Sequence, residues 1–191
     1  APAGIVVPSW LSSDAPLQPA ATILTDVIDT RLDVRFDYKK QHLLGTAVLT
    51  LRSHFYPQSE VVLDAKGFDI QKVELVGDKK NKSLNYNYNR HKLIIALDRS
   101  YPRNTPYQVR IVYVAKPNEL PQGGSAAITS DKGLYFINPL GLEKNKPRQI
   151  WTQGETESSS CWFPTIDKPN QRMTQEISLT VEKQFKTLSN G

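Results

Sequence analysis

Apolar and polar residues alternate with a period of two through much of the chain. Between residues 31 and 38, four apolar or aromatic side chains alternate with four charged ones, which predicts a strand that is buried on one face only. Residues 45–53 alternate in the same way, and a polar Lys-Lys-Gln-His segment between the two stretches supplies a turn. We therefore predict that these two strands pair as an antiparallel hairpin.

Further stretches of strand character follow, with turn signals every ~8 to 12 residues. They lie at residues 61–65, 68–76, 84–89, 92–97, 107–114, 134–137 and 173–181. The alternation slips between Ile70 and Val73, which predicts a β-bulge there. No stretch shows the 3.6-residue period of a long amphipathic helix. The pattern predicts an all-β fold, either an antiparallel β-sandwich or a saddle-shaped sheet assembly.

The length of 191 residues fits one domain with a full core. Residues 1–25 contain several prolines and small side chains without a sustained period, which predicts an irregular N-terminal arm. Residues 26–191 then form a single β domain. Hydrophobic residues make up 39% of the chain and charged residues 23%, as in ordinary folded proteins.

The net charge of +5 raises the question of a polyanionic partner. Lys and Arg are spread along the chain without a run of five or six, so we expect no nucleic-acid partner. No apolar run approaches the ~20 residues of a transmembrane helix. A start at Ala1 without methionine fits a mature exported product or a trimmed chain, and we expect an exported protein, periplasmic or in the cell envelope, rather than a cytoplasmic one.

Catalytic and metal-binding motifs are missing from the sequence. The single cysteine, Cys161, excludes an internal disulfide and a Cys-rich zinc site. None of the three histidines begins a His-Glu-x-x-His motif. The serines at 158–160 lack a Gly-x-Ser-x-Gly elbow. Glu155 and Glu157 on one strand would approach a sugar from the same side, which does not suit a glycosidase. We expect no catalytic residue and no metal ligand in this chain.

The stretch from Trp151 to Pro169 contains a combination of residue types that is rare in segments with a purely structural role. If residues 150–157 are extended, the period of two places Trp151, Gln153, Glu155 and Glu157 on one face. Gly154 between them allows another backbone or a ligand to come close. Such a face would suit a bound cation. The same residues also fit solvated strand carboxylates followed by prolines that end a loop, and chemistry alone leaves both interpretations open.

The spacing of this stretch resembles a signature near the end of the N-terminal domain of zinc aminopeptidases of the aminopeptidase N family, which are gluzincins. That signature reads Gln-x-Glu, then Phe-Pro, then Asp-x-Pro, and the matching positions are Gln153, Glu155, Phe163, Pro164, Asp167 and Pro169. The predicted hairpin, with its Leu-Asp-Val strand and a second strand that begins at glycine, is also similar to the family. The resemblance covers about residues 26–191. Many members carry arginines where this chain has residues 159–162.

In the family, the glutamate of Gln-x-Glu binds the free α-amine of the substrate, and the glutamine lines the same site. The resemblance therefore implies substrate-binding roles for Glu155 and Gln153. The family binds zinc through a His-Glu-x-x-His motif in a downstream thermolysin-like catalytic domain, which also carries a Gly-Ala-Met-Glu-Asn motif that binds the amine. Neither motif occurs in this chain.

The resemblance thus implies the N-terminal domain of a zinc metalloaminopeptidase that hydrolyses N-terminal residues from peptides. Its expected partners are the N-terminus of a peptide substrate and its own catalytic domain, which would hold the zinc. We expect the 191-residue chain by itself to be inactive and to contain no cofactor. The alternative is a stand-alone β-sandwich module that binds peptides or glycans, in which the signature is coincidental.

Overall fold

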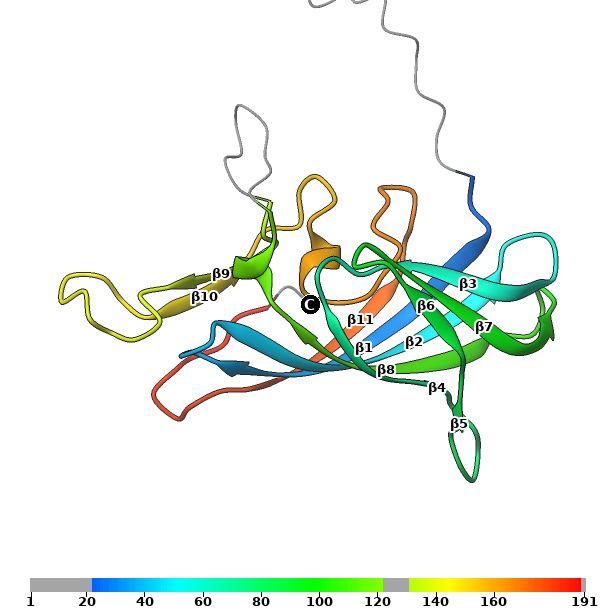
Figure 1. The fold of residues 1–191 in the computed structure, drawn as a ribbon, viewed down its shortest axis with the longest axis horizontal. Helices are drawn as coiled ribbons and strands as arrows, with labels where there is room; N and C mark the ends of the chain where they lie inside the picture. The colour runs from blue at the N-terminus through cyan, green and yellow to red at the C-terminus, as the bar shows by residue number, and fades with distance from the viewer. Residues whose placement is uncertain (1–21, 122–130, 190–191) are drawn as a thin grey trace, which may run out of the picture.

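A computed structural model describes residues 22–121 and 131–189 of the chain (Figure 1). Most of the predicted N-terminal arm, residues 1–21, lies outside the described residues. Within the described ranges the regular structure is β, apart from two short 3-10 helices, η2 (Pro117–Glu119) and η3 (Ser159–Cys161). The predicted all-β class is confirmed.

The described strands form three sheets. The strands are β1 (Thr25–Asp37), β2 (His42–Ser53), β3 (Gln58–Asp64), β4 (Asp69–Leu75), β5 (Lys82–Ser83), β6 (Tyr86–Tyr88), β7 (Lys92–Tyr101), β8 (Tyr107–Ala115), β9 (Leu134–Ile137), β10 (Gln149–Thr152) and β11 (Thr174–Thr180). The largest sheet has the order β11-β1-β2-β8-β4-β5, a second has the order β3-β7-β6, and β10 pairs with β9.

Most of the strand pairs are antiparallel, and β1 and β2 form the predicted hairpin. β6 and β7 pair as a second antiparallel hairpin, within two of the stretches of predicted strand character. The register of β4 against β8 shifts between Ile70 and Lys72, which confirms the predicted bulge. β11 runs parallel to β1, so the large sheet is mixed rather than purely antiparallel.

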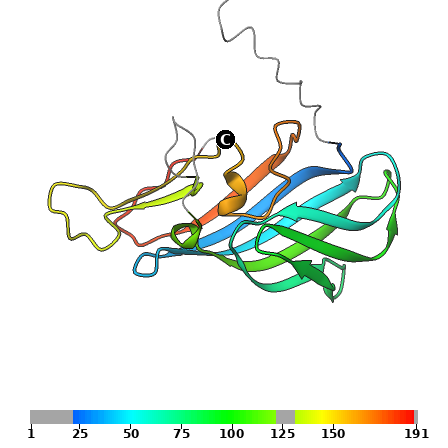
Figure 2. The ribbon, with the colours of Figure 1, turned by 45° about the horizontal axis from the view of Figure 1, so that its top comes forward.

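The three-stranded sheet lies over one half of the large sheet, and the segment with η3 lies beside it over the same face (Figure 2). The core fills the space between these layers. It is formed by the inward-facing residues of β2 and β8 together with apolar residues of β3 and β7, including Leu49, Ile111, Leu63 and Ile95. Each of these side chains is shielded from water. The apolar positions of the alternating sequence thus face the core, and the polar positions between them face the surface.

One close contact in this core concerns Gly45 on β2. Gly45 is the partner of Tyr113 on β8, and a Cβ atom at position 45 would lie 2.5 Å from Cζ of Tyr113. The buried Tyr113 ring stacks on Phe68, with 4.9 Å between the ring centroids. Its hydroxyl donates to the main-chain oxygen of Trp162 at 3.0 Å. Glycine at position 45 therefore makes room for the ring that joins the sheet to the segment after η3.

We predict that Gly45→Ala lowers the free energy of unfolding by about 1–3 kcal/mol, because the Tyr113 ring must move to accept the methyl group. Denaturant unfolding measures this change. In a Tyr113→Leu background the same substitution should cost much less, since the crowding atoms are gone. An equal cost in both backgrounds would contradict the proposed steric cause.

Candidate functional site

The candidate site begins at the β9–β10 hairpin, which projects to one side of the molecule (Figure 1). Trp151 on β10 is paired with Tyr135 on β9, and the two rings stack with 4.3 Å between their centroids. The Gln153 amide donates to the Gly133 carbonyl at 2.9 Å, which continues the ladder by one bond beyond the end of β10. The hairpin therefore fixes the main chain up to Gln153.

The main chain turns directly after this point. Residues 155–158 form a turn, the Ser158 amide donates to the Gly154 carbonyl at 3.0 Å, and the Glu155–Thr156 peptide bond is cis. The expectation of an extended strand over residues 150–157 is therefore wrong beyond Thr152. Glycine at 154 is a weak strand former, and its carbonyl bonds within the turn instead of to a neighbouring strand.

Gln153 and Glu155 still lie together, although they do not share a strand. Nε2 of Gln153 is 3.5 Å from Oε2 of Glu155, which is a long hydrogen bond. Glu155 is exposed and Gln153 is half-buried. An ionised carboxylate has acceptor sites on both oxygens, so this pair presents acceptors to a ligand that donates hydrogen bonds, such as an ammonium group.

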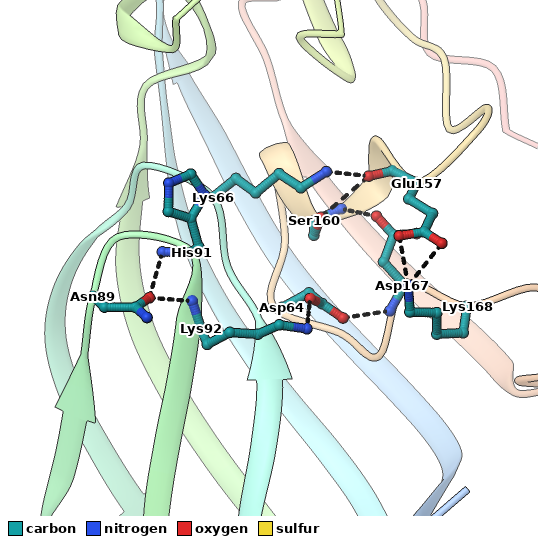
Figure 3. Close-up of polar contacts among 9 residues, drawn as sticks. All are labelled: Asp64, Lys66, Asn89, His91, Lys92, Glu157, Ser160, Asp167 and Lys168. Atoms are coloured by element: carbon teal, nitrogen blue, oxygen red, sulfur yellow. Dashed lines mark hydrogen bonds and ion pairs between the residues drawn. The ribbon is translucent and has the colours of Figure 1, made fainter. Parts of the chain in front are cut away.

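Glu157 is contacted by two lysines, Lys66 and Lys168 (Figure 3). Nζ of Lys168 lies 2.8 Å from each of its carboxylate oxygens. The hydrogen bond with Glu157 is the main cause that raises the pKa of Lys168. Nζ of Lys66 donates to the main-chain oxygen of Glu157 at 2.6 Å. Glu157 is thus attached to the body of the domain through its main chain and its side chain.

The remaining signature residues attach the segment to the sheet. Oδ2 of Asp167 accepts from the Ser160 amide at 2.8 Å, and the Asp167 amide donates to Oδ2 of Asp64 at 3.1 Å (Figure 3). Asp64 also forms an isolated β-bridge with Thr165. Phe163 is buried in the core. Phe163 and Asp167 of the signature therefore support the segment that includes the turn with Glu155.

Two further residues of this site, Asp64 and Lys66, were not identified from the sequence. Asp64 ends β3 and Lys66 lies in the turn that follows it. The side chain of Lys92 on β7 pairs with the Asp64 carboxylate and holds it in place. Both residues contact a segment about 90 to 100 positions further along the chain. A local pattern in the sequence carries no signal for such contacts.

The thiol and two of the three histidine rings of the described residues have structural partners. Cys161 is fully buried, and burial raises the pKa of its thiol to about 11. His42 bonds to Glu119 and His54 bonds to Asp26. Within residues 22–121 and 131–189, no group of three or more His, Cys, Asp or Glu side chains could hold a metal ion. No helix in these ranges is long and apolar enough to cross a membrane.

Comparisons with known proteins agree on one family. The Peptidase M1 N-terminal domain family matches residues 27–191. Leucine aminopeptidase 2 of Sclerotinia sclerotiorum is 25% identical over 153 residues, which cover 78% of this chain and 23% of that protein.

Solved structures share the fold. An M1 zinc metallopeptidase from Deinococcus radiodurans aligns with a TM-score of 0.64 and 18% identity, over 84% of this chain and 33% of that one. Yeast LTA4 hydrolase in complex with bestatin aligns with a TM-score of 0.61 and 17% identity, over 87% of this chain and 25% of that one. The chain thus spans about a quarter to a third of the length of these relatives.

A close approach beside the candidate site depends on Gly133. Gly133 has φ +66°, and a Cβ atom there would lie 1.9 Å from the Ser158 carbonyl oxygen. Gly141 has a similar φ of +71°, but its Cβ atom would lie 3.2 Å from the flexible side chain of Arg148. The two glycines therefore share the same backbone strain for an L-residue and differ in crowding.

We predict that Gly141→Ala lowers the free energy of unfolding by about 1–2 kcal/mol, the cost of a left-handed conformation. Gly133→Ala should cost clearly more, because the Ser158 carbonyl must also move. Denaturant unfolding of both variants measures the difference. If the two substitutions cost the same, the contact with Ser158 does not restrict position 133.

Proposed function

This chain belongs to the Peptidase M1 N-terminal domain family, and we propose that it is the N-terminal domain of a zinc-dependent aminopeptidase that removes N-terminal residues from peptides. Its relatives support this proposal, since they include a leucine aminopeptidase and an M1 zinc metallopeptidase. The described residues of this chain do not fit a zinc centre. In the proposed enzyme the zinc therefore belongs to a catalytic domain that carries the His-Glu-x-x-His motif.

The observation that carries the proposal is the exposed Glu155 carboxylate on a turn that is fixed to the domain body. We propose that Glu155 binds the free α-amine of the substrate and that Gln153 lines the same site. A hydrogen bond between an ammonium group and a carboxylate is about twice as strong as one between neutral groups. This contact would also fix the register of the peptide, so that its first peptide bond is the one that reaches the catalytic centre.

The proposed partner domain would cover part of the β9–β10 hairpin. Three large apolar side chains on this hairpin and its connecting loop, Leu140, Leu142 and Trp151, are 56%, 78% and 45% exposed. A partner domain that covered these side chains would remove apolar surface from water, which is favourable. The side of the domain that carries Gln153 and Glu155 is therefore the side that we expect to face the catalytic domain.

The coding sequence gives a direct test of this proposal. We expect the open reading frame to continue in frame beyond Gly191 into a segment with a His-Glu-x-x-His motif. An in-frame stop codon directly after Gly191 would contradict it. That result would favour the alternative of a stand-alone β-sandwich module that binds peptides or glycans.

In the full-length enzyme, we predict that Glu155→Ala lowers kcat/KM on aminoacyl substrates by roughly thirty-fold to several thousand-fold, because the α-amine loses its charged partner in a dehydrated cleft. Glu157→Ala is the matched control. It removes a partly exposed ion pair with Lys168, and such pairs contribute about 0–1 kcal/mol. Steady-state kinetics distinguishes the two. Equal losses in both variants, or near wild-type activity in folded Glu155→Ala, would show that Glu155 is not the amine anchor.

A further inference from the structure

Two lysines bind the same residue, Glu157, and they bind different parts of it (Figure 3). Lys66 donates to the main-chain oxygen at 2.6 Å, whereas Lys168 pairs with both carboxylate oxygens at 2.8 Å. Glu157 stands two positions after Glu155 in the same turn. A contact with the main chain restricts the path of the turn. A contact with the side chain leaves the main chain free to shift, because the side chain can rotate to follow it.

The two contacts differ in kind rather than in burial, since both are partly buried. The Lys168 and Glu157 side chains are 32% and 42% exposed, so solvent and salt screen their attraction. The contact of Lys66 is a hydrogen bond from a charged donor to a main-chain carbonyl, which is stronger than a neutral one. Lys66 is therefore the lysine whose contact acts directly on the main chain of the turn.

The main chain around Lys66 is held in place by its own hydrogen bond and by the contacts of Asp64. Its amide donates to the Ser160 carbonyl at 2.8 Å, and the Ser160 amide donates to Asp167 at 2.8 Å. Asp64, two residues before Lys66, forms the β-bridge with Thr165. The ammonium group of Lys66 thus extends from a part of the chain that is already fixed to the segment after η3. The main chain of Lys66 is thus fixed by contacts other than the one that its side chain makes with the turn.

We propose that Lys66 is a positioning residue for the amine anchor. Its ammonium group holds the Glu157 carbonyl, which also accepts a longer hydrogen bond of 3.4 Å from the Ser160 hydroxyl, and so helps to determine where Glu155 presents its carboxylate. This inference rests on the proposed function of Glu155 as the group that binds the α-amine. Misplacement of a binding group by about 1 Å can cost on the order of a hundred-fold in rate, so a loss of this one hydrogen bond should be measurable.

The turn should survive the loss of Lys66, which makes the proposal testable. The Ser158 amide still donates to the Gly154 carbonyl, and the Ser158 hydroxyl still lies 3.3 Å from the Glu155 carbonyl oxygen. The core below the segment, including Phe163, is unchanged. We therefore expect Lys66→Met to fold and to change the position of Glu155 rather than the fold of the domain.

The experiment measures the contribution of the α-amine to binding in the full-length enzyme. An amino-acid hydroxamate is compared with the hydroxamate that has the same side chain but no α-amine. Both compounds carry the same zinc-binding group, so the ratio of their inhibition constants isolates the contact to the amine. We expect Lys66→Met to reduce this ratio by about ten-fold, less than the roughly hundred-fold cost of a full 1 Å misplacement because the other hydrogen bonds of the turn remain. Lys168→Met, the matched control, should change it by less than about two-fold.

Lys66→Arg keeps a charged donor at this position and should retain most of the ratio. A loss as large as that of Lys66→Met would overturn the proposal, because the donor would then not be the cause. Equal losses for Lys66→Met and Lys168→Met, or parallel weakening of both hydroxamates, would also overturn it. Should Lys66→Met not accumulate as folded protein, Lys66→Gln, which removes the charge and shortens the side chain, carries the same expectation.

Glu155→Ala separates this inference from the function on which it rests. If Glu155→Ala abolishes the preference for the amine while Lys66→Met leaves it at the wild-type value, the inference is wrong and the amine anchor stands. If Glu155→Ala leaves the preference intact, the proposed role of Glu155 fails, and the positioning role of Lys66 fails with it.

Discussion

The attachment of the segment after β10 to the end of β3 is the interaction on which the candidate site depends. Asp64 and Thr165 exchange main-chain hydrogen bonds of 2.7 and 3.1 Å, and the Asp64 carboxylate accepts from the Asp167 amide. Without this attachment the segment would be a surface loop between two strands. With it, residues far apart in the sequence form one frame, and the turn that carries Glu155 has a fixed position relative to the sheets.

This frame explains why the Gln-x-Glu, Phe-Pro and Asp-x-Pro signature combines such different residues. Gln153 and Glu155 remain accessible, whereas Phe163 fills the core and Asp167 binds the amide of Ser160. A binding group is effective only when its position is set before the ligand arrives, because ordering it later costs free energy. Phe163 and Asp167 therefore set the position of Gln153 and Glu155 before a ligand binds.

Local patterns predicted those parts of the structure that depend on neighbouring residues. The β1–β2 hairpin and the bulge at Ile70 follow from alternation over a few positions. The parallel pairing of β1 with β11 does not, because Asp29 and its partner Thr174 are separated by most of the domain. The same limit applies to Lys66 and its contact with Glu157. The end of β10 at Thr152 was missed for another reason: a polar stretch with one glycine fits a strand and a turn equally well.

The central claim is that Glu155, held in place by this frame, binds the α-amine of the substrate. A crystal structure of the full-length protein with a free amino acid bound in its active site tests it most directly. The account predicts a Glu155 carboxylate oxygen at about 2.7–2.9 Å from the α-nitrogen, the distance of a charge-assisted hydrogen bond. An α-nitrogen bound only by other groups, with Glu155 directed into solvent, would contradict it.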